Sequence, residues 1–240
     1  SEMCIRDRGA NTTLKHNGTT ADSTDRIISL SAAGSLTIDS SGTGLGAVTL
    51  ASGGSFTLPN GTNTIAFVGT NTADNTCARA IANPSTGTTA LTKSGTNKWI
   101  ITGAITHTGD TNINAGTLEF NNQSLSTSNI IFGGAAVLQN VVIAGTTKDI
   151  TCNAGSGNIA EIVAGSVDNT RTGTTSINSG TLRLTTETLT AGVPVKVLGD
   201  TNVTVASGAA IRTTLGITQG GRMHYGGNLT FQSGSSLFLG

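Results

Sequence analysis

The chain has 240 residues, with 13 basic and 13 acidic side chains, 33 glycines and only 3% aromatic residues. The absence of a Lys/Arg cluster excludes a nucleic-acid-binding surface, and the even spread of Leu, Ile and Val at zero net charge excludes disorder. No apolar run approaches the roughly 20 residues needed to span a bilayer, so we expect this segment to make no membrane contact.

The first eight residues differ in composition from the rest of the chain. Ser1–Arg8 carry four charges, whereas charged residues are sparse from residue 9 onward. The octet resembles the translated sequencing-adapter peptide found at the ends of assembled environmental contigs. We interpret residues 1–8 as a non-native addition, with a real charged linker as the alternative. On the first interpretation, residues 9–240 are a fragment, open at both ends, and the lack of a visible signal peptide is uninformative.

Short runs of alternating apolar and polar residues follow one another along the chain. The clearest are Ser35–Ile38, Ala47–Leu50, Ser55–Leu58, Asn202–Val205 and Leu229–Phe231. Period-two alternation rich in Thr, Val, Ile and Leu predicts half-buried strands. Glycine, asparagine and proline follow these runs and predict turns, and no segment has a helical period. The sequence therefore predicts an all-β protein.

Two of the runs recur along the chain. Gly34–Ile38 returns as Gly54–Leu58, and the longer block Thr108–Phe120 returns as Thr172–Leu184. We interpret the first offset as one rung and the second as three rungs of about 20 residues each, which predicts a right-handed parallel β-helix of about eleven rungs. A sandwich or barrel is the alternative fold. It would explain the alternation but not the recurrence.

The longer block assigns a role to several of its residues. Its apolar residues should face inward: Ile113 and Leu118 in the first copy, Ile177 and Leu182 in the second. Gly116 and Gly180 should occupy tight corners, where glycine adopts positive φ at little cost.

The polar residues of the block are expected at the surface. Asn114 and Asn178 can bond the backbone of the turn through their side-chain amides. Thr117 and Thr181 suit exposed strand positions.

The stretch from Lys93 to Gly103, continuing to Leu118, resembles the autotransporter-associated β-strand repeat. That family follows roughly K-x-G-x-G-x-W/L-x-L-x-G and then N-x-Y-x-G-x-T-x-I-x-x-G-T-L. The matching residues here are Lys93, Gly95, Trp99, Ile101, Gly103, Gly109, Thr111, Ile113, Gly116, Thr117 and Leu118. The second copy matches from Gly173 to Leu184. Asn97 departs from the pattern where a second glycine is usual, and His107 where an aromatic residue is usual.

The resemblance implies a structural passenger of a type V-secreted protein, displayed on or released from a Gram-negative bacterium. An adhesive role would follow, toward a glycan or protein on a host or neighbouring cell. Members of the family carry a signal peptide and a C-terminal outer-membrane β-barrel that exports the passenger, and we expect both to lie outside this chain. The alternatives are a carbohydrate-active β-helix enzyme, either a polysaccharide lyase or a glycosidase, and a phage or filamentous surface fibre.

An enzyme of the lyase or glycosidase type needs clustered carboxylates. Two groups could converge on neighbouring rungs: Asp149, Glu161 and Asp168, or Asp110 and Glu119 with Arg183. The acidic residues are otherwise scattered, which favours solvated surface charge.

The histidine and cysteine residues do not form a recognisable site in the sequence. His107 with Asp110 could suggest an activated nucleophile, but no G-x-S-x-G motif is present, and the place of His107 in the repeat favours packing. Outside the octet, Cys77 and Cys152 lie far apart along the chain, without the spacing of a disulfide framework or a zinc site. We expect no catalytic residue, metal or cofactor.

Overall fold

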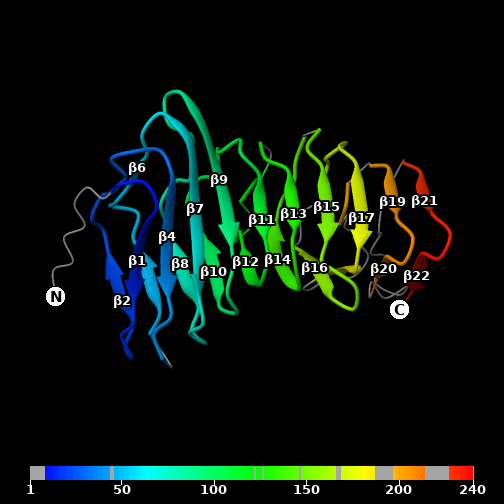
Figure 1. Ribbon diagram of the computed structural model, residues 1–240, viewed down its shortest axis with the longest axis horizontal. Helices are drawn as coiled ribbons and strands as arrows, with labels where there is room; N and C mark the ends of the chain where they lie inside the picture. The colour runs from blue at the N-terminus through cyan, green and yellow to red at the C-terminus, as the bar shows by residue number, and fades with distance from the viewer. Residues whose placement is uncertain are drawn as a thin grey trace.

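The chain forms a rod of stacked β-strands (Figure 1). The structure is a computed structural model that describes residues 9–43, 46–121, 123–125, 127–145, 147–165, 169–186, 197–199, 201–213 and 227–239. All the regular elements in these residues are strands, and none of these residues belongs to a helix able to cross a membrane. The predicted all-β solenoid is confirmed. The interpretation of residues 1–8 lies outside the described residues.

The strands form three parallel sheets, which we number I to III. Sheet I contains β1 (Thr12–His16), β4 (Ser35–Ser40), β7 (Gly61–Gly69), β9 (Gly87–Lys93), β11 (Thr111–Ile113), β13 (Ile130–Phe132), β15 (Ile150–Asn153), β17 (Thr175–Ser179), β19 (Val203–Val205) and β21 (Leu229–Phe231). Sheet II contains β2 (Asp22–Thr24), β5 (Val48–Leu50), β8 (Asn75–Cys77), β10 (Lys98–Ile101), β12 (Gly116–Glu119), β14 (Ala136–Val141), β16 (Ile159–Ala164), β18 (Thr181–Thr186), β20 (Ala210–Thr213) and β22 (Ser236–Leu239). Sheet III pairs β3 (Ile28–Ser29) with β6 (Phe56–Thr57).

The rungs keep the predicted length only in the middle of the rod. In sheet I, Leu91 pairs with Thr111, Thr111 with Ile130 and Ile130 with Ile150, so these three steps match the expected repeat. The remaining steps of sheet I are longer, as from Leu36 to Ile65 or from Thr175 to Val203. Among the described residues, ten strands stack in each of sheets I and II, where about eleven rungs were predicted.

The offset between the two copies of the longer block does correspond to three rungs. Ile113 and Ile177 lie in one column of sheet I, three steps apart. In sheet II the second copy is displaced by two residues, because the column of Leu118 leads to Leu184 rather than to Leu182. An even displacement leaves every side chain on its original face, so Leu182 still points inward.

The shorter repeat was interpreted wrongly. Leu36 lies in β4 of sheet I, whereas Phe56 lies in β6 of sheet III. The neighbour of Leu36 on the next rung is Ile65. The two copies are therefore not successive rungs. Alternation marks any half-buried strand and does not tell which face of the coil the strand occupies.

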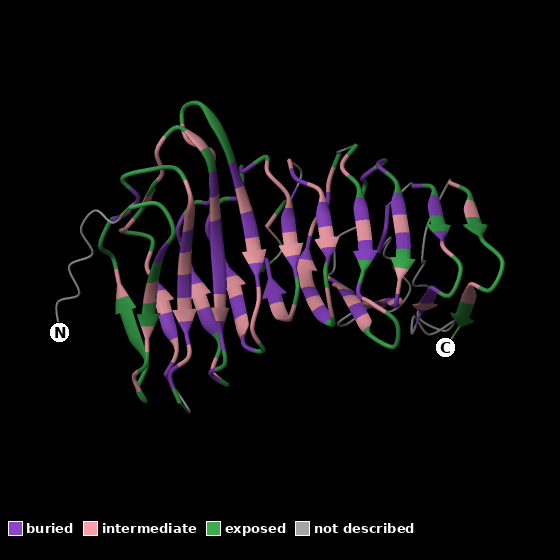
Figure 2. Ribbon diagram, viewed as in Figure 1, coloured by how far each residue is buried: buried purple, intermediate pink, exposed green. Residues whose placement is uncertain are grey.

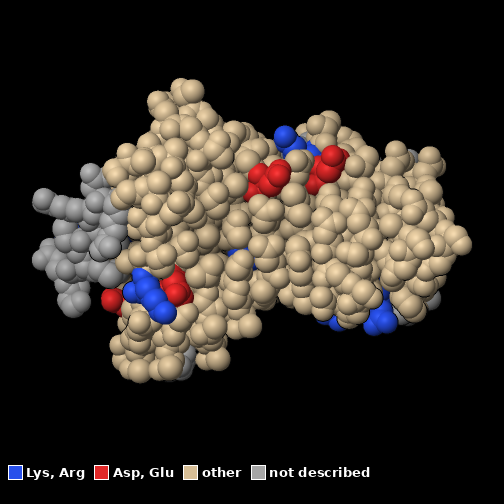
Figure 3. Space-filling model, viewed as in Figure 1, with Lys and Arg blue, Asp and Glu red and all other residues tan. Residues whose placement is uncertain are grey.

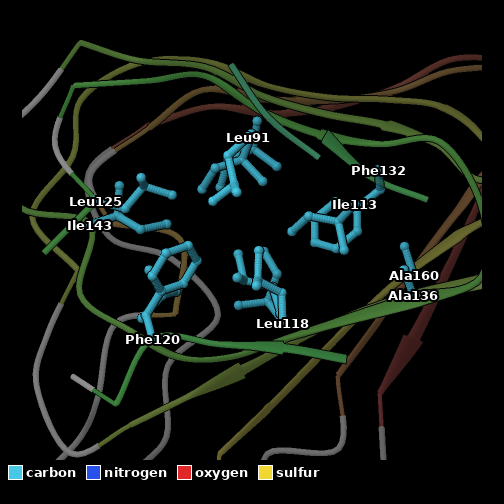
Figure 4. Close-up of a cluster of buried hydrophobic side chains, with 14 of the residues drawn as sticks. Leu91, Ile113, Leu118, Phe120, Leu125, Phe132, Ala136, Ile143 and Ala160 are labelled. Carbon is cyan, nitrogen blue, oxygen red and sulfur yellow. The ribbon is translucent and has the colours of Figure 1, made fainter. Parts of the chain in front are cut away.

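Buried residues alternate with less buried ones along most strands of the rod, whereas β2, β21 and β22 at its ends contain no buried residue (Figure 2). Leu91, Ile113 and Phe132 meet Leu118 and Phe120 across the interior (Figure 4), and all five are fully buried. Burying each such side chain stabilises the fold by about 1.5–3 kcal/mol. Since each rung touches only its neighbours, stability accumulates along the rod.

The two cysteines of the described chain belong to this interior. Cys77 and Cys152 are buried and unpaired. Burial raises the pKa of the Cys77 thiol to about 12 and also raises that of Cys152. Both side chains are therefore protonated at neutral pH, when the reactive thiolate is scarce.

Gly116 and Gly208 provide a matched test of corner packing. Both have positive φ, 67° and 74°. A Cβ at Gly116 would lie 2.4 Å from the carbonyl oxygens of Asn97 and Gly95, whereas a Cβ at Gly208 would meet nothing within 4 Å. We expect Gly208→Ala to cost about 1–2 kcal/mol for the left-handed backbone alone. Gly116→Ala should cost about 2–5 kcal/mol, because overpacking is added. Urea unfolding of both variants measures the difference, and equal losses would contradict it.

Candidate functional site

The interior of the rod contains charged side chains as well as apolar ones. Lys93 and Arg171 are fully buried, and Arg79 is 1% exposed. All three lie at corners of the coil, and none forms an ion pair with a described carboxylate within 4 Å. Their hydrogen bonds go to backbone carbonyls instead, apart from one that Arg171 Nη2 donates to Thr175 Oγ1, so they act as internal caps for the corners.

Lys93 joins two successive corners between sheets I and II. It is the last residue of β9, and its Nζ donates to the carbonyls of Ser94 (2.9 Å) and Gly95 (2.8 Å) in its own corner. A third bond of 3.2 Å reaches Ala115 in the corner of the next rung. Burial lowers the pKa of Lys93 to about 8, so the ammonium form still predominates at pH 7.

The two buried arginines cap other corners. Arg79 donates from Nε to Ala51 O (3.3 Å) and from Nη2 to Thr24 O (2.8 Å), and so reaches across two rungs. Arg171 Nη1 donates to three carbonyls, those of Lys148 (3.0 Å), Gly173 (2.8 Å) and Thr174 (3.1 Å). Burial lowers the pKa of Arg171 to about 10, which leaves it charged at neutral pH.

A cluster of amides fills the sheet I to sheet II corner on the rung of Lys93 and on the rung before it. Asn75 Oδ1 accepts from Ser40 Oγ at 2.6 Å and from Val48 N at 2.9 Å. Asn71 Oδ1 accepts from the amides of Asn75 and Asn97, both at 3.0 Å. Asn97 stands where the repeat pattern has glycine, and here it connects the regular rungs to the longer ones. No pattern in the sequence marks this cluster.

His107 is a buried, neutral side chain. Its Nε2 lies 2.9 Å from Thr111 Oγ1, which in turn lies 2.8 Å from Ser128 Oγ. Burial lowers the pKa of His107 to about 4. Asp110 is engaged elsewhere, since its Oδ1 accepts from Asn129 Nδ2 at 3.0 Å. The pair is therefore not arranged as a base and its orienting carboxylate.

Asp110 and Asp149 belong to a ladder on the outside of the rod. Each residue of the ladder immediately precedes a strand of sheet I. Asn129 Oδ1 accepts from Asp149 N at 3.2 Å, and Asp149 Oδ1 accepts from Thr174 N and Oγ1 at 2.7 and 2.8 Å. These side chains bind successive rungs to one another at the corner.

The two carboxylate groups considered for catalysis are not brought together. Glu161 lies in β16 of sheet II and pairs with Arg183, whereas Asp149 lies at the edge of sheet I. Glu119 pairs with Lys98 at 2.7 Å rather than with Arg183. Asp168 lies outside the described residues. Within the described ranges, no group of three or more His, Cys, Asp or Glu side chains could hold a metal ion.

The glycines of the repeat lie where neighbouring rungs approach closely. Gly95, Gly116 and Gly180 have φ of 77°, 67° and 76°. At Gly103 and Gly173 a Cβ would lie 2.1 Å from a backbone oxygen of the preceding rung, and at Gly109 the distance would be 2.6 Å. A side chain at these positions would force the rungs apart.

The other repeat positions divide between the interior and the surface. Trp99, Ile113, Leu118, Ile177 and Leu182 are fully buried. The remaining positions, Thr117 and Thr181 with the side chains of Asn114 and Asn178, lie on the outer side. The two asparagines bond side chains of the adjacent rung, Ser94 Oγ at 3.3 Å and Asn153 Oδ1 at 2.9 Å, rather than the turn backbone.

Known proteins share this repeat. Residues 91–120 and 165–184 match the family model of the passenger-associated-transport-repeat. The adhesin BmaC autotransporter of Brucella suis biovar 1 (strain 1330) is 43% identical over 116 residues, which cover 48% of this chain and 3% of that protein. No solved structure matches the chain. Two segments of the chain are thus similar to a passenger-associated repeat, and the chain spans a small part of the length of the relative that it matches.

The capping role of Lys93 can be measured against Lys98. We expect Lys93→Met to lower the free energy of unfolding by about 2–4 kcal/mol, because three inward carbonyls lose their donor. Lys98→Met should cost less, about 1 kcal/mol, since Lys98 is partly exposed and Glu119 keeps its hydrogen bond from Asn140 Nδ2. Chemical denaturation of both variants provides the comparison. A loss at Lys93 no larger than that at Lys98 would rule out the capping role.

His107 makes the stability of its rung dependent on pH. Its folded pKa of about 4 lies below the unfolded value near 6.5. The unfolded chain therefore takes up the proton first, and stability present above about pH 6.5 falls as the pH drops toward 4, by up to about 3 kcal/mol. His107→Phe should remove this part of the decline while leaving that of the carboxylates. Parallel urea titrations at pH 7.5, 5.5 and 4.5 test this, and superimposable pH profiles for the two proteins would refute it.

Proposed function

We propose that residues 9–240 are part of the passenger of an autotransporter, a non-enzymatic rod that holds adhesive surface outside the bacterial cell. The observation that carries this proposal is the position of the matched repeat. Residues 91–120 run from the last three residues of β9 to just beyond β12, where Lys93 caps the corner and Gly103, Gly109 and Gly116 admit the neighbouring rungs. The repeat is therefore the stacking unit of the rod.

The surface chemistry supports a scaffold. The outward column of sheet I is dominated by small hydroxylated residues, namely Thr13, Thr37, Thr92, Thr151, Ser176, Thr204 and Thr230. Figure 3 shows this side of the rod as largely free of charged side chains. Such a face offers many equivalent weak contacts, which gain strength through multivalency.

The name of the Brucella relative supports the adhesive part of the proposal, and the repeat supports export. Adhesion by the whole protein would use a ligand on a host or neighbouring cell. Export would use an outer-membrane translocator carried by the full-length protein.

A one-rung deletion provides a control that preserves folding. Ile130 pairs with Ile150, so removal of residues 130–149 takes out one rung and keeps every strand facing its own column. The full-length gene would be expressed in a Gram-negative host with no deletion, with residues 130–149 deleted, or with residues 9–240 deleted. Antibodies against the purified chain should label intact cells of the first two strains, and the third should attach less to epithelial monolayers. Labelling only after permeabilisation, or unchanged attachment of the third strain, would contradict the proposal.

A further inference from the structure

The side of the rod that carries sheet III, which we call the third side, is interrupted after β6. Strand β6 pairs with β3 on the preceding rung, where Ser55 O accepts from Ile28 N at 3.0 Å. On the following rung, Ile81 pairs in parallel with Ile105 of the rung after it and not with β6. No backbone hydrogen bond between described residues joins β6 to Ala80–Ala82. Two strand edges therefore face one another without pairing.

The interruption opens a groove of about 460 Å³. It is lined by Ser52, Gly54, Ser55, Phe56, Thr57, Leu58, Ala80, Ala82, Asn83, Pro84 and Ser85. The rungs rejoin beyond both ends of the groove, where Ala78 N donates to Leu50 O at 2.9 Å and Gly61 N donates to Thr86 O at 2.8 Å. The opening is therefore held by the stacked rungs on either side, and its volume lies in the range of small-molecule sites.

Both walls of the groove offer backbone donors and acceptors. Successive residues of a strand direct their N–H and C=O groups to opposite edges. Since the carbonyls of Ser55 and Thr57 accept from the β3 side, the N–H and C=O of Phe56 face the groove. On the opposite wall, Ile81 uses its own groups toward the next rung, which leaves those of Ala80 facing the groove.

The side chains of the groove are neutral and mixed in character. None of the lining residues is ionisable. Ser52, Ser55 and Ser85 supply hydroxyls, and Phe56 supplies a half-buried ring. The guanidinium of Arg79 lies 5.5 Å from the centre of that ring. Because Arg79 itself is buried, it supports the ring without presenting its charge to the groove.

We propose that this groove binds a neutral saccharide of one or two units. The C–H face of a pyranose packs on Phe56, and its hydroxyls exchange hydrogen bonds with the free backbone groups and the serines. A charged ligand would lose hydration without meeting a counter-charge. This inference rests on the adhesive function proposed above, for which it names a ligand class and a location.

The test uses the ¹⁵N-labelled chain and three neutral disaccharides, maltose, cellobiose and lactose, followed by amide chemical shifts. At least one should shift the amides of Ser52–Leu58 and Ala80–Ser85, with a Kd on the order of 1 mM, as befits a small, shallow site. Sialyllactose is the matched acidic probe, and a capped Val-Thr-Val-Thr peptide tests the strand edges. Tighter binding of either than of every neutral sugar, or no groove shift with any neutral sugar, would overturn the proposal.

Three variants assign the binding to the groove. Ser85→Trp fills the groove and should abolish the shifts, whereas Phe56→Ala should weaken binding about tenfold, which corresponds to about 1.4 kcal/mol. Ser156→Ala, in the exposed turn between β15 and β16, is the control and should bind as the parent does. Thermal melts establish that each variant is folded. Undiminished binding by a folded Ser85→Trp protein would overturn the site.

The Ser85→Trp substitution also tests the groove separately from the adhesive function. Ser85→Trp in the displayed full-length protein should reduce attachment. Unchanged attachment of that variant, together with the loss of attachment on deletion of residues 9–240, would remove the groove from adhesion and leave the passenger function standing.

Discussion

Backbone carbonyls that turn inward at the corners of the coil must find hydrogen-bond donors, and the rest of the structure depends on this requirement. A strand satisfies its backbone through its neighbours, but a corner breaks the ladder, and a buried carbonyl without a donor costs about 1–3 kcal/mol. Lys93 and Arg171 each satisfy three carbonyls from a single side chain. An amide has two donors, whereas an ammonium has three and a guanidinium five. This explains why cations occupy an interior that otherwise contains Leu, Ile and Phe.

Placing cations inside changes the charge of the outside. The described residues include nine Lys and Arg and eight Asp and Glu. Three of the nine cations and one of the eight carboxylates, Glu119, are buried, so six cations remain to face seven carboxylates, a difference of one negative charge. The balanced formal charge of the sequence therefore does not describe the surface of this part of the chain. Several of the outer charges are neutralised locally, as Lys98 is by Glu119 and Glu161 by Arg183. What remains on the outer face of sheet I is mainly hydroxyls and amides.

The sequence predicted the parts of the fold that follow from periodicity. Alternation and the recurrence of Thr108–Phe120 identify parallel rungs, because equivalent positions must stack in register. The same reasoning failed for Leu36 and Phe56, since alternation is common to every side of the coil. The buried cations were not predicted as interior residues either. A lone Lys or Arg in a sequence is normally exposed, and only the carbonyls gathered around Lys93 explain its burial. The groove depends on a missing pairing, which no local pattern records.

The groove follows from a change in rung geometry along the rod. Strands β7 and β9 contain nine and seven residues, whereas β11 and β13 contain three each. Because these two strands are longer, the turns that lead into them project beyond the rest of the rod, as the raised edge at β7 and β9 shows (Figure 1). The third side of these rungs then has further to travel and separates after β6. The matched repeat at residues 91–120 begins among the short rungs from Leu91 to Ile150. A strictly repeating solenoid presents the same surface on every rung, so a single distinct site requires a departure from the repeat, and in this chain that departure is the lengthening of two strands.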